Sequence, residues 1–102
     1  MPVEVKHENG IMTAVISGEI DHHTARAIRE AIDSAAERMK PEHMRLDFSE
    51  VSFMDSSGIG LIMGRYRLMQ EMGGSLELIG ASSNIARMIK LAGLSRLGVK
   101  GV

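Results

Sequence analysis

The sequence lacks cysteine, long apolar runs and any large excess of one charge. Without cysteine, neither a disulfide framework nor a thiolate metal site can form. No segment approaches the ~18 consecutive apolar residues of a membrane-spanning helix, and residues 1–6 lack the apolar core of a signal peptide. The formal net charge of −1 argues against a general nucleic-acid-binding protein. We therefore expect a cytoplasmic protein that binds neither membranes nor nucleic acids.

The composition is that of a folded domain. Hydrophobic residues make up 44% of the 102 residues and charged residues 25%, which are ordinary values for a globular protein. A chain of this length can bury one packed core. No repeat, linker or low-complexity tract divides the chain. We therefore predict a single domain spanning residues 1–102.

Basic residues collect towards the C-terminus, where no acidic residue follows Glu77. The residues concerned are Arg87, Lys90, Arg96 and Lys100. A solvent-exposed helix face accounts for such a distribution, and a docking surface for an acidic partner is the alternative.

The first half of the chain predicts a β-hairpin followed by a helix. Strands are expected at Val3–His7 and Ile11–Ser17, because Asn-Gly between two such runs favours a tight turn. Asp21 is expected to cap a helix over His22–Lys40, which Pro41 ends. Apolar residues recur on one face of that helix, at Ala25, Ile28, Ile32, Ala35 and Met39.

The second half alternates strands and helices. A strand at Met44–Phe48 and a polar turn lead into a helix from Ser56 to about Met72, which Gly73 and Gly74 end. A strand at Ser75–Ile79, a helix capped around Ser82 and ending at Gly93, and a short last strand through Leu97 and Val99 follow. Alternation of this kind predicts an α/β fold with helices packed on a mixed sheet, largely parallel after the antiparallel hairpin.

The sequence Asp55-Ser56-Ser57-Gly58 is typical of a helix start and carries two hydroxyl groups. One interpretation is simple capping of the helix. The other is phosphorylation, because a phosphate in the first helical turn is tolerated by the helix but repels an apolar partner. Phe53, Met54 and Ile59 are expected to supply the apolar surface.

Two separated motifs carry a resemblance to a known family. Residues 53–58 (FMDSSG), followed by Gly60 and residues 64–66 (GRY), resemble the signature of STAS domains (sulfate transporter and anti-sigma antagonist). Within that family they are most similar to the anti-sigma F factor antagonists of spore-forming bacteria. Residues 18–25 (GEIDHHTA) match where the family begins its first helix. The resemblance covers about residues 3–97, although the antagonists continue into a further C-terminal helix beyond the position of Val102.

The resemblance implies a regulatory protein that is not an enzyme and carries no cofactor. Its unphosphorylated form is expected to bind an anti-sigma factor that is also a serine kinase, and so to release a sporulation-type sigma factor. The implied phosphorylation site is Ser56, although helix-start chemistry alone does not choose between Ser56 and Ser57. A phosphatase of the PP2C class is expected to reverse the modification. The implied partner-binding residues are Asp21, His22, His23, Thr24, Met54, Asp55, Ser56, Ser57, Gly58 and Ile59.

Two other patterns in the sequence suggest different kinds of site. Adjacent histidines His22 and His23 point in different directions on a helix and have no third ligand nearby, so no metal site is expected. The spacing of Gly58, Gly60 and Gly64 matches no nucleotide-binding loop. We expect Gly60 and Gly64 to allow a close helix contact, and Gly58 to keep bulk away from the serine. The alternatives that stay open are a STAS regulator of a stress-response pathway and a small nucleotide-binding protein.

Overall fold

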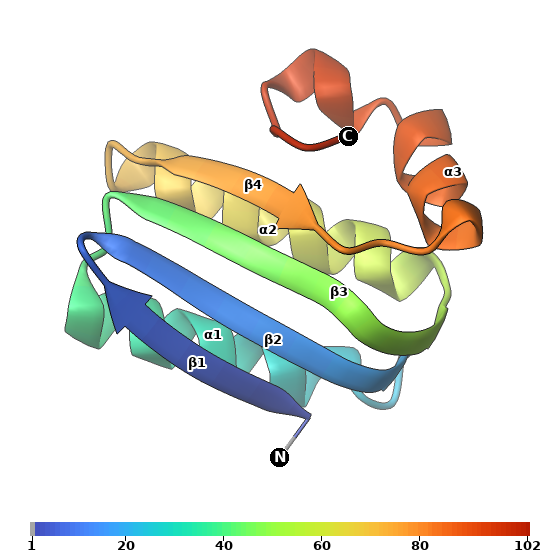
Figure 1. Cartoon of the computed structure of the whole chain (residues 1–102), viewed down its shortest axis with the longest axis horizontal. Coiled ribbons are helices and arrows are strands. Elements are labelled where there is room, and N and C mark those ends of the chain that lie inside the picture. Colours follow the sequence, from blue (N-terminus) through green and yellow to red (C-terminus); the bar gives the residue numbers. More distant parts are fainter. Residues whose placement is uncertain (1) are drawn as a thin grey trace.

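The computed structural model describes residues 2–102 as one four-stranded sheet with helices on it. The strands lie in the order β1-β2-β3-β4. Helices α1 and α2 both pack on one face of the sheet, as Figure 1 shows. The elements are β1 (Val3–Glu8), β2 (Ile11–Ile20), α1 (Ala25–Met39), β3 (His43–Met54), α2 (Ser56–Glu71), β4 (Ser75–Ile79), α3 (Ser83–Leu91) and the 3-10 helix Leu94–Leu97.

The sheet is mixed, as the sequence predicts. Strands β1 and β2 pair antiparallel, whereas the β2–β3 and β3–β4 pairs are parallel. Asn9 and Gly10 form the hairpin turn with φ angles of 53° and 79°. Such positive angles at both central positions are what a tight hairpin turn requires and what Asn-Gly provides at low cost. The α/β fold and its antiparallel N-terminal hairpin are therefore confirmed.

The core lies between the sheet and the two helices. Alternate residues of β2 and β3 are buried because successive side chains of a strand point to opposite faces. Helix α1 contributes the stripe predicted from its spacing, with Ile28 and Ile32 fully buried. Each such side chain contributes about 1.5–3 kcal/mol when it leaves water. The buried strand residues in the centre of the sheet are Met12, Ala14, Ile16, Met44, Leu46 and Phe48.

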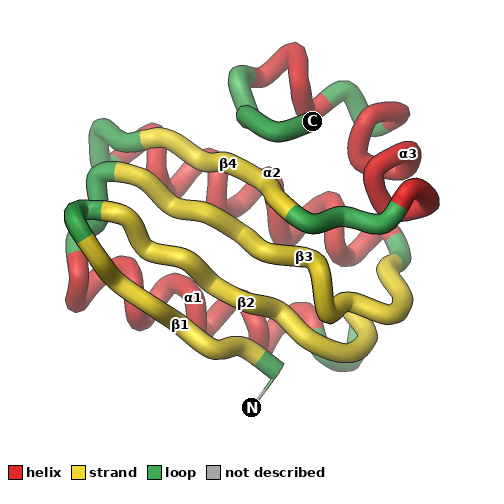
Figure 2. The backbone as a smooth tube through the Cα atoms, in the orientation of Figure 1, coloured by secondary structure: helices red, strands yellow, loops and turns green. Residues whose placement is uncertain are grey.

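Two strands run further than predicted. Strand β2 continues to Ile20 and β3 to Met54, so the polar turn expected after Phe48 is wrong. Figure 2 shows the strand continuing through a bend before α2. Both strands are longer than predicted because they pair with each other. Ser17 through Ile20 of β2 lie opposite Glu50 through Met54 of β3, and the β2–β3 register shifts twice in this part of the sheet. A neighbouring strand thus holds extended a segment whose own sequence favours a turn.

The start of α1 and the C-terminal tail also differ from the prediction, whereas the end of α2 agrees with it. Helix α1 begins at Ala25, so the predicted start at His22 and cap at Asp21 are wrong. Helix α2 ends at the expected glycines, where Gly73 N–H bonds to Gln70 and Gly74 N–H bonds to Met69. The predicted strand at Leu97–Val99 is wrong. The tail forms the 3-10 helix, and Lys100 pairs with β4 through a single bridge.

A charged pair is buried where α1 meets α2. Arg65 Nε lies 2.8 Å from Asp33 Oδ1, with the Arg65 side chain 7% exposed and that of Asp33 31% exposed. The two atoms are close but not aligned as a hydrogen bond, and Arg65 Nη1 has no hydrogen-bond partner within residues 2–102. Burial lowers the pKa of Arg65 and raises the pKa of Asp33, and their mutual attraction offsets each shift only in part.

We predict that Asp33→Ala destabilises the protein more than Arg65→Met does. The first change leaves a buried cation without its partner, at a cost of about 1–3 kcal/mol. The second leaves a carboxylate whose side chain is 31% exposed, although its Oδ1 is buried, and a methionine fills the buried space. Urea unfolding of both variants and the parent protein measures the difference. An Arg65→Met variant that is the less stable of the two would contradict it.

Candidate functional site

The two sequence motifs meet at one edge of the sheet. Because β2 and β3 are parallel neighbours, their C-terminal ends lie together. Ile20 pairs with Met54, and the Asp55 backbone N–H donates a 3.1 Å hydrogen bond to the Ile20 carbonyl oxygen. The loop Asp21–Thr24 therefore lies next to the start of α2. We call this edge, with both loops, the switch edge.

At the start of α2 the cap is Asp55. Its carboxylate accepts a 2.8 Å hydrogen bond from the Ser57 backbone N–H. Capping therefore does not depend on either serine hydroxyl. Ser56 is exposed and Ser57 half-buried, so both lie within the first helical turn as predicted. An exposed hydroxyl at this position is chemically available for modification.

The conformation of the neighbouring loop is fixed by hydrogen bonds between its own polar groups. Asp21 Oδ1 accepts hydrogen bonds from the backbone N–H groups of His23 (2.9 Å) and Thr24 (3.0 Å). Thr24 Oγ1 in turn accepts from Asp21 N–H and donates to the Glu19 carbonyl oxygen. Desolvation raises the pKa of Asp21, but the hydrogen bonds from His23 and Thr24 outweigh it and lower the pKa overall. The His22 and His23 side chains of this loop are exposed to solvent, and their ring centroids lie 3.9 Å apart.

A groove of about 440 Å³ runs between the starts of α1 and α2. It joins the two motifs, because His22 and Ser57 both line it. Two arginines of α1, Arg26 and Arg29, make it basic. Arg26 lies 3.4 Å from Glu30, an exposed pair of the kind that contributes little to stability. In the sequence both arginines lie outside the apolar stripe of this helix, and nothing local indicates that α2 packs beside them.

Met54 corrects one expected feature of this surface. Its side chain is 4% exposed and packs inward, so it does not provide the predicted apolar contact for a partner. Phe53, which is 52% exposed, is the large apolar side chain at the surface here. Phe53 rather than Met54 is exposed because successive side chains of β3 point to opposite faces of the extended strand.

The glycines of α2 have roles different from those expected. A Cβ atom on Gly58 would overlap the Met54 side chain, so this glycine makes room for Met54 rather than for the serine. A Cβ atom on Gly60 or Gly64 would meet nothing within 4 Å. The predicted close approach of another element at Gly60 and Gly64 is therefore wrong.

The arrangement defines a class of protein: a small α/β domain with a rigid, hydroxyl-bearing helix start displayed at one edge of its sheet. Within residues 2–102, no group of three or more His, Asp or Glu side chains is placed to hold a metal ion. No helix in this part of the chain has the length and apolar content needed to cross a membrane. The STAS domain family model matches residues 2–99, and the chain belongs to this family.

Named relatives are regulators. The chain is 35% identical to the anti-sigma F factor antagonist of Paenibacillus polymyxa, over 95% of this chain and 83% of the relative. It is 34% identical to the anti-sigma-B factor antagonist of Bacillus subtilis, over 90% and 83% respectively. The structure of the Bacillus cell fate determinant SpoIIAA in its phosphorylated form is also similar, with a TM-score of 0.73 and 28% identity over 92% of this chain and 86% of that one. These regulatory relatives confirm the expectation of a protein that is not an enzyme.

We predict that Gly58→Ala lowers the free energy of unfolding by about 1–3 kcal/mol, because the added methyl group overpacks Met54. Gly60→Ala and Gly64→Ala are matched controls in the same helix. Both are expected to stabilise the protein by roughly 0.5–1 kcal/mol, because alanine favours a helix more than glycine does. Thermal and urea unfolding check all three. Equal effects at the three positions would contradict the proposed contact between Met54 and Gly58.

Proposed function

We propose that this protein is an anti-sigma factor antagonist whose binding is switched off by phosphorylation of Ser56. The unphosphorylated form binds an anti-sigma factor that is also a serine kinase, and a sigma factor is thereby released. A phosphatase of the PP2C class removes the phosphate. The observation that carries the proposal is the exposed Ser56 at the capped start of α2, directly beside the hydrogen-bonded Asp21–Thr24 loop. Because sigma factors act on RNA polymerase, we place this exchange in the cytoplasm.

The proposed partner-binding surface is the switch edge. It consists of the Asp21–Thr24 loop, Asp55 through Ser57, and Ile59, joined by the exposed ring of Phe53. Met54 and Gly58 belong to it indirectly, because they pack beneath the serines and hold the helix start in place. Support comes from the names of the relatives and from the contact between the two loops.

The phosphate is proposed to act through charge rather than through refolding. It adds about −1.5 to −2 charges at the surface, directly after the Asp55 cap and three residues from the exposed Phe53. The start of α2 tolerates this charge, because a helix N-terminus carries partial positive charge. A partner that docks on the surface does not tolerate this charge, because its apolar atoms would exclude water from the phosphate without replacing the lost hydrogen bonds. Binding is lost while the fold stays intact.

We predict that Ser56→Ala binds the anti-sigma factor as tightly as the parent protein does and cannot be switched off by ATP. Ser56→Asp is expected to bind at least about tenfold more weakly, a loss of roughly 1.4 kcal/mol, because it places a permanent charge at the contact. Calorimetric titration with the purified anti-sigma factor measures both.

Ser95→Asp is the matched control, because Ser95 is exposed in the 3-10 helix and lies outside the switch edge. It adds the same charge and is expected to leave the affinity unchanged. Equal affinities of Ser56→Ala and Ser56→Asp would rule out Ser56 as the switch. Parent protein that binds no anti-sigma factor would instead rule out the function itself.

The pathway has two candidates. Identity to the sigma F antagonist of Paenibacillus polymyxa (35%) is almost equal to identity to the sigma-B antagonist of Bacillus subtilis (34%). The motif Asp21-His22-His23-Thr24 favours the sporulation pathway in our proposal, and a stress-response pathway is the second candidate. A pull-down from source-cell extract with ATP, followed by identification of the bound kinase, discriminates between them.

A further inference from the structure

The groove between the starts of α1 and α2 is basic and contains no acidic side chain of its own. Its two cations, Arg26 and Arg29, stand three residues apart on α1, so they project from neighbouring positions of one helix face. We call this cavity the α1–α2 groove. Its lining consists of His22, Ala25, Arg26, Arg29, Ser57, Gly60 and Leu61.

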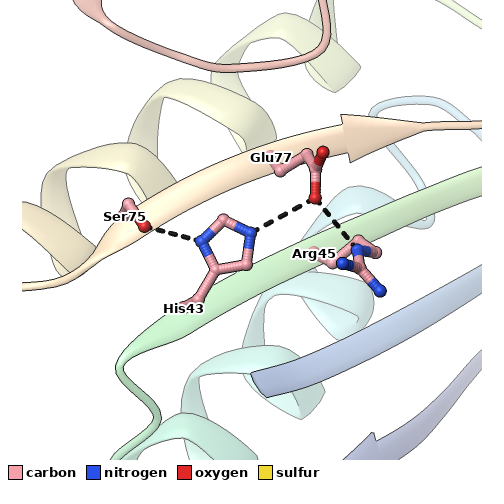
Figure 3. Close-up of polar contacts among 4 residues, drawn as sticks. All are labelled: His43, Arg45, Ser75 and Glu77. Carbon is pink, nitrogen blue, oxygen red and sulfur yellow. Dashed lines mark hydrogen bonds and ion pairs between the residues drawn. The ribbon is translucent and has the colours of Figure 1, made fainter. Parts of the chain in front are cut away.

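Arg45, by contrast, is an arginine that the chain neutralises itself. Its Nε lies 3.0 Å from a Glu77 carboxylate oxygen on the sheet face opposite the helices, as Figure 3 shows. His43 Nε2 lies 3.3 Å from the same oxygen, and its Nδ1 lies 2.6 Å from Ser75 Oγ. The hydrogen bonds from Arg45 and His43 lower the pKa of Glu77, so the carboxylate stays ionised beside the cation. An arginine with such a partner offers little charge to a ligand.

The arginines of the α1–α2 groove have no comparable partner. Arg29 is exposed and forms no ion pair within residues 2–102. Arg26 lies 3.4 Å from Glu30, but both side chains are largely exposed, and a pair of this kind contributes little. Asp33, one turn beyond Arg29, is already paired with Arg65. Two guanidinium groups are therefore available to an anion that enters the groove.

Small residues leave the space between the two helices open. Gly60 of α2 has no side chain, and a Cβ atom placed there would meet no other atom within 4 Å. Ala25 of α1 adds only a methyl group, and Leu61 is buried in the core. The resulting volume of about 440 Å³ lies within the usual range of ligand sites and is enough for side chains of a docked peptide.

The position of the groove favours a segment of a protein partner over a free small anion. His22 and Ser57 belong both to the groove and to the proposed partner-binding surface. A protein docked on that surface would cover the groove, and it would bury two unpaired cations unless it supplied carboxylates. An acidic segment also agrees with the direction of the switch, because a phosphate on Ser56 repels a carboxylate held beside it.

We propose that the α1–α2 groove binds an acidic segment of the anti-sigma factor, with Asp or Glu side chains paired to Arg26 and Arg29. Because the segment belongs to the anti-sigma factor, this site rests on the proposed function, to which it adds the chemistry of recognition. A guanidinium group binds a carboxylate through two parallel hydrogen bonds, which fix its orientation. Gly60 then determines specificity, because a side chain there would occupy the space that the segment needs.

Paired variants test the role of charge. Arg26→Gln/Arg29→Gln is expected to weaken binding of the purified anti-sigma factor by about three- to thirtyfold and to reduce the salt dependence of the affinity. The control Arg38→Gln/Arg67→Gln removes the same charge from exposed sites of α1 and α2 outside the groove, and should leave the affinity unchanged. Calorimetric titration at low and at high salt measures both. An equal loss of affinity in the two double variants would overturn the proposal.

A substitution at Gly60 tests the role of the open space. Gly60→Gln is expected to weaken binding of the anti-sigma factor by about tenfold or more while leaving the fold intact, because the position is exposed and helical. Gly64→Gln is the matched control, one helical turn away, with the same open surroundings and outside the groove. Thermal unfolding checks that both variants fold. Equal affinities of these two variants would count against a segment seated in the groove.

A peptide probe separates the groove from the proposed function. Hexaglutamate added to the ¹⁵N-labelled protein at low salt is expected to give saturable NMR shifts at Arg26, Arg29, Ser57 and Gly60, and none at these positions in Arg26→Gln/Arg29→Gln. Hexalysine should give none in either protein. The absence of saturable shifts with hexaglutamate, or tighter binding of ATP or inorganic phosphate at the same residues, would overturn the groove proposal and leave the switch at Ser56 standing. Groove shifts in a protein that binds no anti-sigma factor would instead overturn the proposed function and leave the groove as a site for acidic peptides.

Discussion

The parallel pairing of β2 with β3 is the constraint on which the rest of this structure depends. It brings Ile20 beside Met54 and allows the Asp55 N–H to bond to the Ile20 carbonyl oxygen. Two segments far apart in the sequence thereby become one surface. Without that pairing the Asp21–Thr24 loop and the Ser56 hydroxyl would have no fixed relative position. The proposed partner could then not contact both at once.

The helix start is supported from beneath as well as from the side. Met54 fills the space that Gly58 leaves open, and the Asp33–Arg65 pair joins α1 to α2 further along the helix. Asp55 caps the first turn, so the serine hydroxyls are not needed to hold the helix together. A phosphate on such a support changes the charge of the surface without removing any of the contacts that form it. This is why we attribute the proposed switch to electrostatics and desolvation.

Features that depend on local chemistry were predictable from the sequence. The Asn9-Gly10 turn, the apolar stripe of α1, the glycine end of α2 and the helix start at Ser56 each follow from a short pattern, and the structure contains all of them. The family resemblance rested on two such patterns, and the match over residues 2–99 confirms it.

Features that depend on packing were not predictable in the same way. The extension of β3 through polar residues needs the partner strand, and the inward direction of Met54 follows from that extension. The open surroundings of Gly60 and Gly64, and the tail that pairs only at Lys100, likewise depend on which elements lie nearby. Arg26 and Arg29 entered the candidate site for the same reason, because α2 packs beside them. A single sequence carries no direct signal for such long-range neighbours.

The most direct test of the central claim is a comparison of backbone NMR shifts between the unphosphorylated protein and the protein phosphorylated on Ser56. If the phosphate acts through charge on a preformed surface, the shift changes will be confined to the start of α2, the Asp21–Thr24 loop and the end of β3. The same sample should lose its affinity for the anti-sigma factor. Changes that spread through the core residues of β1, β4 or the far end of α1 would contradict the account, because they would mean that the phosphate refolds the domain.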